Sequence, residues 1–280
     1  MTAPGALSDS ECVGFLQWAL PRMGLRWDGF RRVRRQVCKR LARHLTALGI
    51  SDFRAYRARL AAHPEEWEAL DALCRVTISR FMRDRGVFLY LRDVVLPDLA
   101  RRARERNDAT VRVWCAGCAS GEEPYTVSVL WHLALRARFP DVRLRVLGTD
   151  VDAHVLRRAE TACYEAGTLR ELPAAWREAA FRRVGERFCL REAFRADVAF
   201  RRADVRDAPP PGPFDLVLCR NLVFTYFDAP GRLRFLEVLA ERVPEKGVLV
   251  LGAHEAQPEG TITFMRERPG LPVYRRIAMR

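Results

Sequence analysis

Val111-Arg-Val-Trp-Cys-Ala-Gly-Cys-Ala-Ser-Gly-Glu-Glu-Pro-Tyr125 joins a short apolar segment to a glycine-containing loop and then to a helix start with two carboxylates. Parallel α/β proteins bind phosphates at such junctions, because the free N–H groups and the dipole of a helix N-terminus attract anions. Those phosphate loops use glycines and carry no acid. Here Glu122 and Glu123 occupy that place. The stretch therefore predicts a cofactor site that favours a cationic ligand over a pyrophosphate, and S-adenosylmethionine, with a sulfonium and an ammonium group, is such a ligand.

The two glutamates are expected to have different roles. Ser120 and Glu123 have the spacing of a capping box, in which Ser120 caps the helix and Glu123 bonds back to the N–H of the cap. Pro124 is tolerated in the first turn of a helix. This interpretation uses Glu123 for capping and leaves Glu122 to face the ligand.

Two cysteines of the same loop, Cys115 and Cys118, allow three interpretations. Their spacing is that of a thioredoxin-type motif, but the acids that follow would raise a thiol pKa, whereas redox chemistry needs a lowered one. A zinc site needs a second ligand pair, and the sequence has no other Cys-x-x-Cys and no His-x-x-x-His pair. We therefore expect small, buried loop residues and no metal site.

Length, cysteine use and charge set further bounds. The chain has 280 residues, enough for one large domain or two modest ones. Its other cysteines are scattered, and no charged segment followed by an apolar one opens it, so we expect reduced thiols and a cytoplasmic protein. No apolar run reaches membrane-spanning length, so no membrane insertion is expected. The formal charge of +13 allows nucleic acid, an acidic protein surface or a carboxylate substrate as a partner, and does not choose among them.

The first hundred residues are predicted to be helical. Helical spacing of apolar residues is shown by Phe30, Val33, Val37, Leu41 and Leu45. The positions between them are mostly basic: Arg31, Arg32, Arg34, Arg35, Lys39, Arg40 and Arg43. This amphipathic helix presents either a solvated basic face or a docking surface for an acidic partner. Further helices are expected after a cap at Ser51, over 65–74 and over 88–99, and the charged segment 101–108 is the expected domain boundary.

After residue 108 the pattern changes to strands that alternate with helices. Strands are predicted at 111–115, 143–148, 214–219 and 247–252, and helices at 122–139, 153–161 and 230–243. This order predicts a parallel sheet with right-handed crossovers. Segments 188–190 and 198–202 are expected as short extended pieces of an insertion, and 261–265 with 272–277 as an antiparallel pair that closes the sheet.

Polar residues follow several of these strands. Ligands of an open parallel sheet bind beyond the carboxyl ends of its strands. Asp150 ends one strand, where a carboxylate can accept both hydroxyls of a ribose, and Asp204 follows another and could accept from an adenine amino group. Cys219-Arg220-Asn221 ends a third. An acid at one strand end is often only a helix cap, but three such ends with complementary groups predict a nucleoside-containing ligand.

The sequence resembles a known family in several motifs. Trp114-Cys-Ala-Gly-Cys-Ala-Ser-Gly-Glu-Glu-Pro-Tyr125, Gly148-Thr-Asp-Val-Asp152 and Phe214-Asp-Leu-Val-Leu-Cys-Arg-Asn221 are similar to motifs of CheR-type chemoreceptor methyltransferases. Thr77-Ile-Ser-Arg-Phe-Met-Arg-Asp84 and Gly252-Ala-His-Glu255 resemble two further segments, with departures at Met82, Asp84 and Ala253 and after Asn221. The resemblance covers about residues 25 to 255.

The resemblance implies a class I methyltransferase (Rossmann-like) α/β fold with a mostly parallel sheet and an antiparallel C-terminal hairpin. It also implies a small N-terminal helical domain with its linker over 1–105, a cofactor-binding domain over 106–280, and a short inserted β-subdomain at about 164–200. S-adenosylmethionine is the implied cofactor, with S-adenosylhomocysteine as product. The implied cofactor contacts are Thr77, Ser79, Arg83, Glu122, Asp150, Asp204, Val205, Arg220 and Asn221. Arg83 is also the implied catalytic residue and is expected to reach the reacting centre from the N-terminal domain.

The implied reaction is methyl transfer to a glutamate side chain of an acidic, helical, chemoreceptor-like protein. Two alternatives stay open: a divergent relative that methylates a small molecule, and a signalling module that binds the cofactor without turnover. A nucleic-acid base methyltransferase is not favoured, since Cys219-Arg-Asn-Leu222 stands where such enzymes carry an Asn/Asp-Pro-Pro-aromatic motif. The sequence does not predict an oligomeric state.

Overall fold

The computed structural model describes residues 8–278, and these form two compact units. The helical unit comprises Met1–Val76 with Thr225–Gly231, and the sheet unit comprises Thr77–Phe224 with Arg232–Arg280. The division after Val76 differs from the expected boundary at 105/106, because the helices of 85–104 pack in the core of the sheet unit. Residues 1–7 and 279–280 of the expected domains lie outside the described residues.

The helical unit confirms the helical prediction for the first part of the chain. Its elements are α1 (Asp9–Ala19), η1 (Leu20–Met23), α2 (Trp27–Phe30), α3 (Arg34–Ala47), α4 (Phe53–Ala62) and α5 (Glu66–Cys74). The cap of α4 is Asp52, which accepts from the N–H of Ala55 at 2.8 Å, and not the predicted Ser51. The carboxylate of Glu66 is buried and accepts from Tyr56 Oη, Arg59 Nε and a ring nitrogen of His44. This network ties α3, α4 and α5 together.

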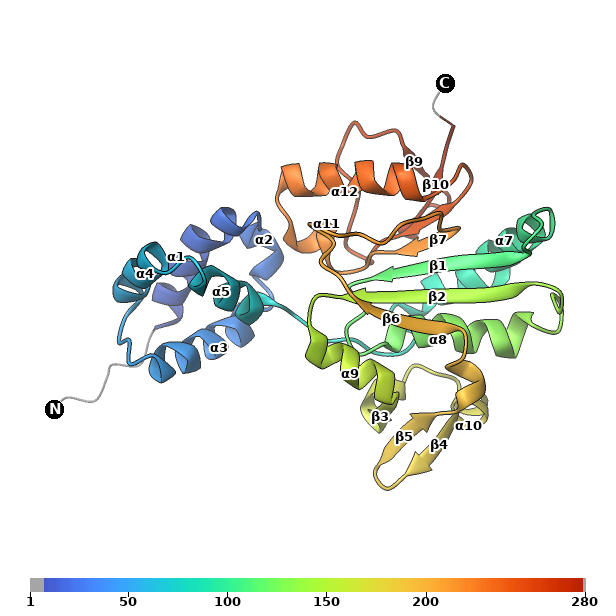
Figure 1. The fold of residues 1–280 in the computed structure, drawn as a ribbon, viewed down its shortest axis with the longest axis horizontal. Helices are drawn as coiled ribbons and strands as arrows, with labels where there is room; N and C mark the ends of the chain where they lie inside the picture. Colours follow the sequence, from blue (N-terminus) through green and yellow to red (C-terminus); the bar gives the residue numbers. More distant parts are fainter. Residues whose placement is uncertain (1–7, 279–280) are drawn as a thin grey trace. The chain divides into compact units, whose positions relative to one another are not determined.

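The sheet unit contains a seven-stranded, mostly parallel sheet (Figure 1). Its strands are β1 (Thr110–Ala116), β2 (Arg143–Asp150), β6 (Val198–Arg202), β7 (Leu216–Leu218), β8 (Val248–Val250), β9 (Phe264–Arg266) and β10 (Val273–Arg276). They lie in the order β6-β2-β1-β7-β8-β10-β9, and β10 runs antiparallel to both of its neighbours. This confirms the predicted α/β class, the parallel sheet and the antiparallel C-terminal pair.

Helices cover both faces of this sheet. Their bounds are α6 (Arg85–Tyr90), η2 (Leu91–Val95), α7 (Leu96–Arg104), α8 (Glu122–Leu130), η3 (Trp131–Leu135), α9 (Ala153–Thr161), α11 (Val223–Tyr226) and α12 (Ala229–Arg242). Val113 and Cys115 of β1 lie in one core with residues of α7 and α8. Trp114 points to the other face, where its ring packs on Phe235 of α12. The alternation of side chains along β1 therefore buries both faces, as expected for a central parallel strand.

A second, smaller sheet forms the β-subdomain. It has the order β3-β5-β4, with β3 (Cys163–Glu165), β4 (Phe181–Val184) and β5 (Arg187–Leu190) all antiparallel. The short helices η4 (Ala166–Leu169), α10 (Ala174–Ala180) and η5 (Glu192–Phe194) accompany it. The predicted extended piece at 198–202 is instead β6, an edge strand of the main sheet.

The expectation of eight reduced thiols is wrong. Cys12 is bonded to Cys38 in the helical unit, and Cys163 is bonded to Cys189, its direct cross-strand partner in the β-subdomain. In each pair the two cysteines are 26 residues apart in sequence. A separation of this length does not identify two cysteines as partners. Cys74, Cys115, Cys118 and Cys219 are free and buried. Both Cys115 and Cys118 are buried as expected, but only Cys118 lies in the loop, since Cys115 belongs to β1. Burial raises the pKa of both thiols.

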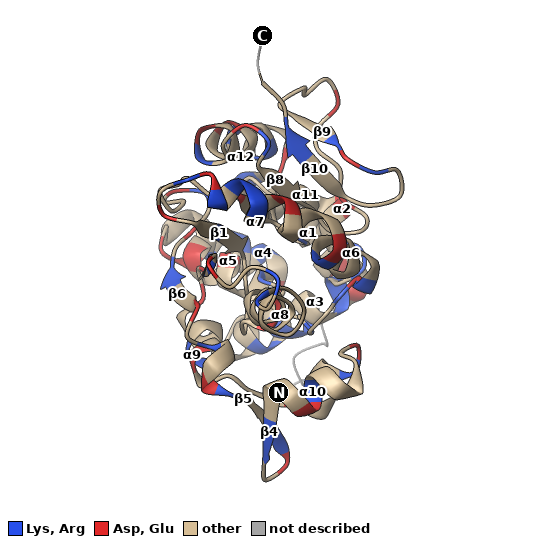
Figure 2. Cartoon of the chain, turned by 90° about the vertical axis from the view of Figure 1, so that its right-hand side faces the viewer, with Lys and Arg blue, Asp and Glu red and all other residues tan. Residues whose placement is uncertain are grey.

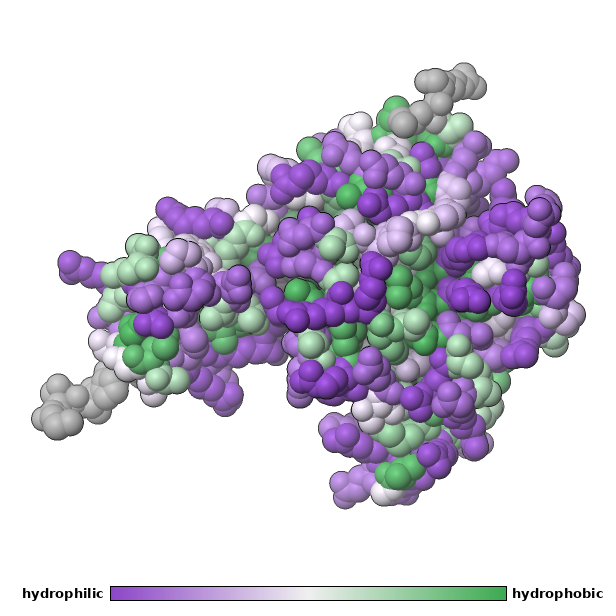
Figure 3. Space-filling model, in the orientation of Figure 1, coloured by the Kyte–Doolittle hydropathy of each residue, from purple (hydrophilic) through white to green (hydrophobic). Residues whose placement is uncertain are grey.

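Charged and hydrophilic side chains dominate the visible surfaces. Figure 2 shows basic residues on many elements, and Figure 3 shows hydrophilic residues over most of one face. Within residues 8–278, no helix is both long and apolar enough to cross a membrane.

Candidate functional site

The loop after β1 is held by the end of β2. The N–H groups of Gly117 and Cys118 donate to Thr149 O at 2.8 and 2.9 Å. The Asp150 carboxylate accepts from Ala119 N at 2.9 Å with one oxygen and from Asp152 N at 3.0 Å with the other. Asp150 thus orders the loop and lies beside it at the carboxyl edge of the sheet.

A glycine is required where this loop enters α8. Gly121 has φ +87°, and an added Cβ would lie 2.9 Å from the Cβ of Ala159. Both the left-handed backbone and the close approach exclude a side chain here. The loop therefore runs tightly over α9 into the helix that carries both glutamates.

Glu122 is a buried carboxylate with one unused oxygen. The residue is 4% exposed, and Oε2 has no hydrogen-bond partner within residues 8–278. Burial raises the pKa of Glu122 to about 7, while the charge of Arg158 and a hydrogen bond from Ser79 act in the opposite direction. A buried acceptor without a partner costs free energy. Glu122 is therefore suited to bind a cationic ligand, and Ser79 lies against it.

The predicted capping box is wrong. The N-cap of α8 is Gly121, and no side chain caps it. Glu123 instead pairs with Arg220, with Nη1 and Oε2 2.8 Å apart. Burial raises the pKa of Glu123, and the charges of Arg220 and Arg83 oppose that shift. A buried guanidinium is a stronger partner for a carboxylate than a backbone N–H at the helix end, which explains the difference.

Arg220 is the centre of a buried charge cluster. Its side chain is 3% exposed and also pairs with Asp84 at 2.5 Å. Its Nη2 donates to Arg83 O at 2.8 Å, and its guanidinium lies over the ring of Phe88. Its Nε, in contrast, is buried and has no partner among the described residues 8–278. Both terminal nitrogens donate to protein groups, whereas Nε is a buried nitrogen that donates to no described residue.

Arg83 lies in a tight turn of the sheet unit. Met82 has φ 55° and Asp84 has φ 62°, so both neighbours of Arg83 adopt the left-handed conformation. The Arg83 guanidinium donates to Ile78 O at 3.0 Å. The expectation that Arg83 belongs to the N-terminal domain is corrected, since Thr77 and all following residues to Phe224 belong to the sheet unit.

Asn221 and Glu255 form a further contact at the strand ends. Asn221 has φ 56°, and its N–H donates to Glu255 Oε2 at 2.8 Å. Gly252 N donates to the same oxygen at 2.6 Å. Glu255 ends the segment Gly252-Ala-His-Glu255, and no role was predicted for it. Its buried carboxylate joins the ends of β7 and β8.

The remaining predicted contacts are Asp204, Val205 and Thr77, and they make fewer hydrogen bonds to the residues described above. Asp204 and the buried Val205 follow the end of β6, and the hydrogen bond from Ala203 N to Asp150 O at 3.0 Å places them beside the end of β2. The carboxylate of Asp204 is paired with Arg206 at 2.6 Å. Thr77 is partly buried in the irregular segment that precedes the Arg83 turn.

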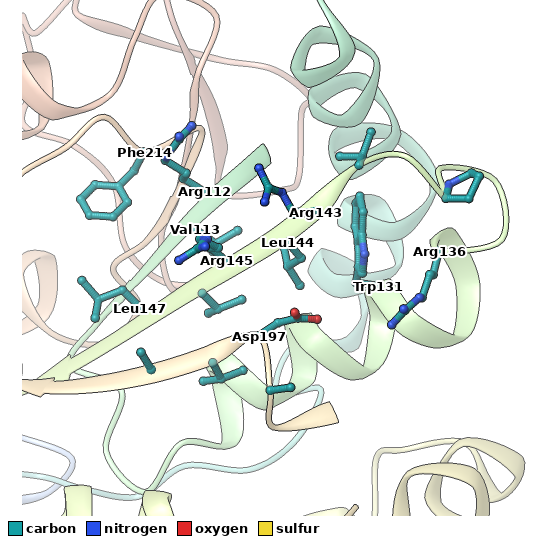
Figure 4. A pocket seen from close by; sticks show the side chains of 16 residues that line it. Arg112, Val113, Trp131, Arg136, Arg143, Leu144, Arg145, Leu147, Asp197 and Phe214 are labelled. Atoms are coloured by element: carbon teal, nitrogen blue, oxygen red, sulfur yellow. The ribbon is translucent and has the colours of Figure 1, made fainter. Parts of the chain in front are cut away.

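A cavity of about 550 Å³ lies elsewhere in the sheet unit (Figure 4). It is lined along Arg143–Leu147 of β2, with Arg112, Arg136 and Asp197 around it. This is the amino-terminal part of β2, whereas Asp150 is at its carboxyl end. The cavity is therefore separate from the cluster of predicted cofactor residues.

Comparisons with known proteins agree with this geometry. A sequence profile described as "CheR methyltransferase, SAM binding domain" matches residues 77–268. A probable chemotaxis protein methyltransferase of Rhizobium etli is 32% identical over 246 residues, which cover 85% of this chain and 90% of that protein. A chemotaxis protein methyltransferase of Klebsiella aerogenes is 33% identical over 257 residues, which cover 89% of this chain and 84% of that protein. A chemotaxis protein methyltransferase of Salmonella typhimurium is 30% identical over 263 residues, which cover 91% of this chain and 86% of that protein. The profile and these relatives show that the chain belongs to the CheR methyltransferase family, whose cofactor is S-adenosylmethionine.

Proposed function

We propose that this protein transfers a methyl group from S-adenosylmethionine to the carboxylate of a glutamate side chain on an acidic, helical, chemoreceptor-like protein. One observation carries the cofactor site: a buried acceptor, Glu122 Oε2, and a buried donor, Arg220 Nε, both lack partners within residues 8–278. The amino-acid part of S-adenosylmethionine carries an ammonium and a carboxylate. These two groups match the unused acceptor and the unused donor in charge.

The other predicted contacts fit the rest of the cofactor. Asp150 would accept from the ribose hydroxyls, and Asp204 and Val205 would bind the adenine. Thr77, Ser79 and Asn221 would complete the site. Each of these residues lies in the sheet unit, at the carboxyl ends of its strands or in the segment before the Arg83 turn.

The chemistry requires alignment more than acid–base catalysis. Bound S-adenosylmethionine supplies a methyl group activated by the adjacent sulfonium. A glutamate side chain has an ordinary pKa of about 4.3 and is already ionised at neutral pH, so no general base is required. Arg83 would orient the attacking carboxylate with paired N–H groups, which favours one approach direction.

The basic face of α3 supports a protein acceptor. Arg32 just before the helix and Arg35, Lys39 and Arg43 within it recur every three or four residues, and all are exposed. The opposite side of the helix, with Val37, Leu41 and Leu45, is buried. An exposed row of cations attracts an acidic surface over about 8–10 Å at moderate ionic strength. The relatives named above as chemotaxis protein methyltransferases also support a receptor-like acceptor.

We expect calorimetry to show binding of S-adenosylmethionine and S-adenosylhomocysteine and none of NAD. The acid-bearing loop disfavours a pyrophosphate, because Glu122 and Glu123 occupy the helix start where dinucleotide sites leave free N–H groups. Equal or tighter binding of NAD would show that the cofactor site is assigned wrongly.

Reversal of one charge on α3 is expected to slow encounter with the acceptor. Arg35→Glu should lower the initial rate of methyl transfer to an acidic helical peptide at low salt, and the wild-type rate should fall as salt rises. Arg54→Glu is the matched control, because Arg54 is an exposed arginine of the same unit on α4. Rates that are independent of salt, or equal in both variants, would favour a small uncharged acceptor.

A further inference from the structure

The charge cluster around Arg220 joins three separate segments of the sheet unit. Arg220 follows β7, Glu123 lies in the first turn of α8, and Asp84 precedes α6. The two carboxylates engage different terminal nitrogens of the guanidinium: Nη1 contacts Glu123 Oε2 at 2.8 Å, and Nη2 contacts Asp84 Oδ2 at 2.5 Å. Because a guanidinium is planar and rigid, two such contacts fix its orientation. The direction of the Nε–H bond, which has no partner among residues 8–278, is therefore fixed as well.

The same guanidinium also holds the turn that carries Arg83. Its Nη2 donates to Arg83 O at 2.8 Å, between the left-handed residues Met82 and Asp84. Left-handed backbone at residues with side chains persists only where the surroundings hold it. A second hydrogen bond, from Met82 N to Thr126 Oγ1 at 3.2 Å, also stabilises this turn. The location of Arg83 thus depends on Arg220, and that of Arg220 on its two carboxylates.

Each carboxylate is adjacent in sequence to a residue of the proposed site. Glu123 follows Glu122, and Asp84 follows Arg83. We propose that Asp84 and Glu123 are positioning residues, which orient Arg220 so that its Nε binds the carboxylate of the cofactor's amino-acid part and which keep the Arg83 turn in place. This inference rests on the proposed function, and neither carboxylate is a cofactor contact in it.

Two ligands distinguish a role of Asp84 and Glu123 in positioning Arg220 from a role in stabilising the fold alone. S-adenosylhomocysteine carries the amino-acid part, and 5′-methylthioadenosine lacks it while keeping the adenosine. By calorimetry, Asp84→Asn and Glu123→Gln should each weaken S-adenosylhomocysteine binding by about tenfold, the size of one charged hydrogen bond. Binding of 5′-methylthioadenosine should change by less than about twofold, because the affected donor faces only the missing group.

A double-mutant cycle tests whether the carboxylates act through Arg220. Glu123→Gln/Arg220→Gln should bind S-adenosylhomocysteine no more weakly than Arg220→Gln alone, because Glu123 has nothing left to position. The control is Asp215→Asn, which breaks another ion pair of the sheet unit, between the buried Asp215 and the half-exposed Arg106 at 2.6 Å. This control should lower thermal stability and leave the affinity ratio of the two ligands unchanged.

The outcomes distinguish this inference from the proposed function. Equal weakening of both ligands, or additive losses in the double variant, would show that the cluster only supports the fold and would overturn the inference. If Glu123→Gln does not fold, Asp84→Asn carries the same test with Arg220→Gln, since the Asp84 side chain is 31% exposed and its change is milder. A wild-type protein that binds 5′-methylthioadenosine and not S-adenosylhomocysteine would instead contradict the proposed cofactor site.

Discussion

Glu122→Gln is expected to weaken binding of S-adenosylhomocysteine at pH 8 by about ten- to a hundredfold, because loss of a charged acceptor removes about 1.5–3 kcal/mol. Burial has raised the pKa of Glu122 to about 7, with Arg158 and Ser79 as its stabilising neighbours. The affinity of the wild type should therefore fall as the pH drops below about 7, because Glu122 becomes protonated. The affinity of Glu122→Gln should not show this fall. Calorimetry between pH 6 and pH 8 measures both, and Glu160→Gln, an exposed carboxylate of α9, is the control.

The same group has a second effect on the free protein. Its folded pKa is raised, so its contribution to stability is fully present below the ordinary value of 4.5 and is lost as the pH rises through about 7. The difference corresponds to roughly 3 kcal/mol. Thermal unfolding without ligand should show this loss in the wild type and not in Glu122→Gln. Parallel curves for the two proteins would mean that Glu122 titrates normally.

Arg83→Ala is expected to reduce methyl transfer to a glutamate-bearing helical peptide by roughly 10- to 100-fold with the fold intact, since it loses a paired, charged donor. Arg83→Lys should recover only part of the rate, because lysine keeps the charge and loses the planar fork. Arg85→Ala removes a neighbouring exposed arginine at the start of α6 and should leave the rate unchanged. Circular dichroism verifies folding. Undiminished transfer by folded Arg83→Ala would remove Arg83 from the site.

Regular periodicity made most of the fold predictable. The alternation of apolar strands with amphipathic helices specified the parallel sheet, and β2 and β6 begin and end within two residues of the prediction. The boundary between the units was not predictable in this way. The charged segment 101–108 has the composition of a linker, yet α7 extends into it as far as Arg104 and buries Leu99 and Ala103 in the core of the sheet unit.

The site was predictable where one residue acts on its own strand end, and not where distant residues pair. Asp150 is the last residue of β2, and its place at a strand end was predicted from the apolar pattern before it. The partner of Glu123 could not be found from local spacing, because Arg220 is 97 residues away and is brought close only by the parallel register of β1 and β7. A capping box was the best local explanation, but a buried arginine outcompetes it. The disulfides were missed for another reason, because scattered cysteines without a signal-like start were interpreted as reduced thiols.

The central claim is that a glutamate carboxylate on a helical protein receives the methyl group. The most direct test uses S-adenosylmethionine labelled in its methyl group, with an acidic helical peptide and the same peptide in which glutamine replaces each glutamate. The proposed function predicts label in the glutamate peptide only, released as volatile methanol by mild alkali because a carboxylate methyl ester hydrolyses. Label that resists alkali, or that enters both peptides equally, would contradict it.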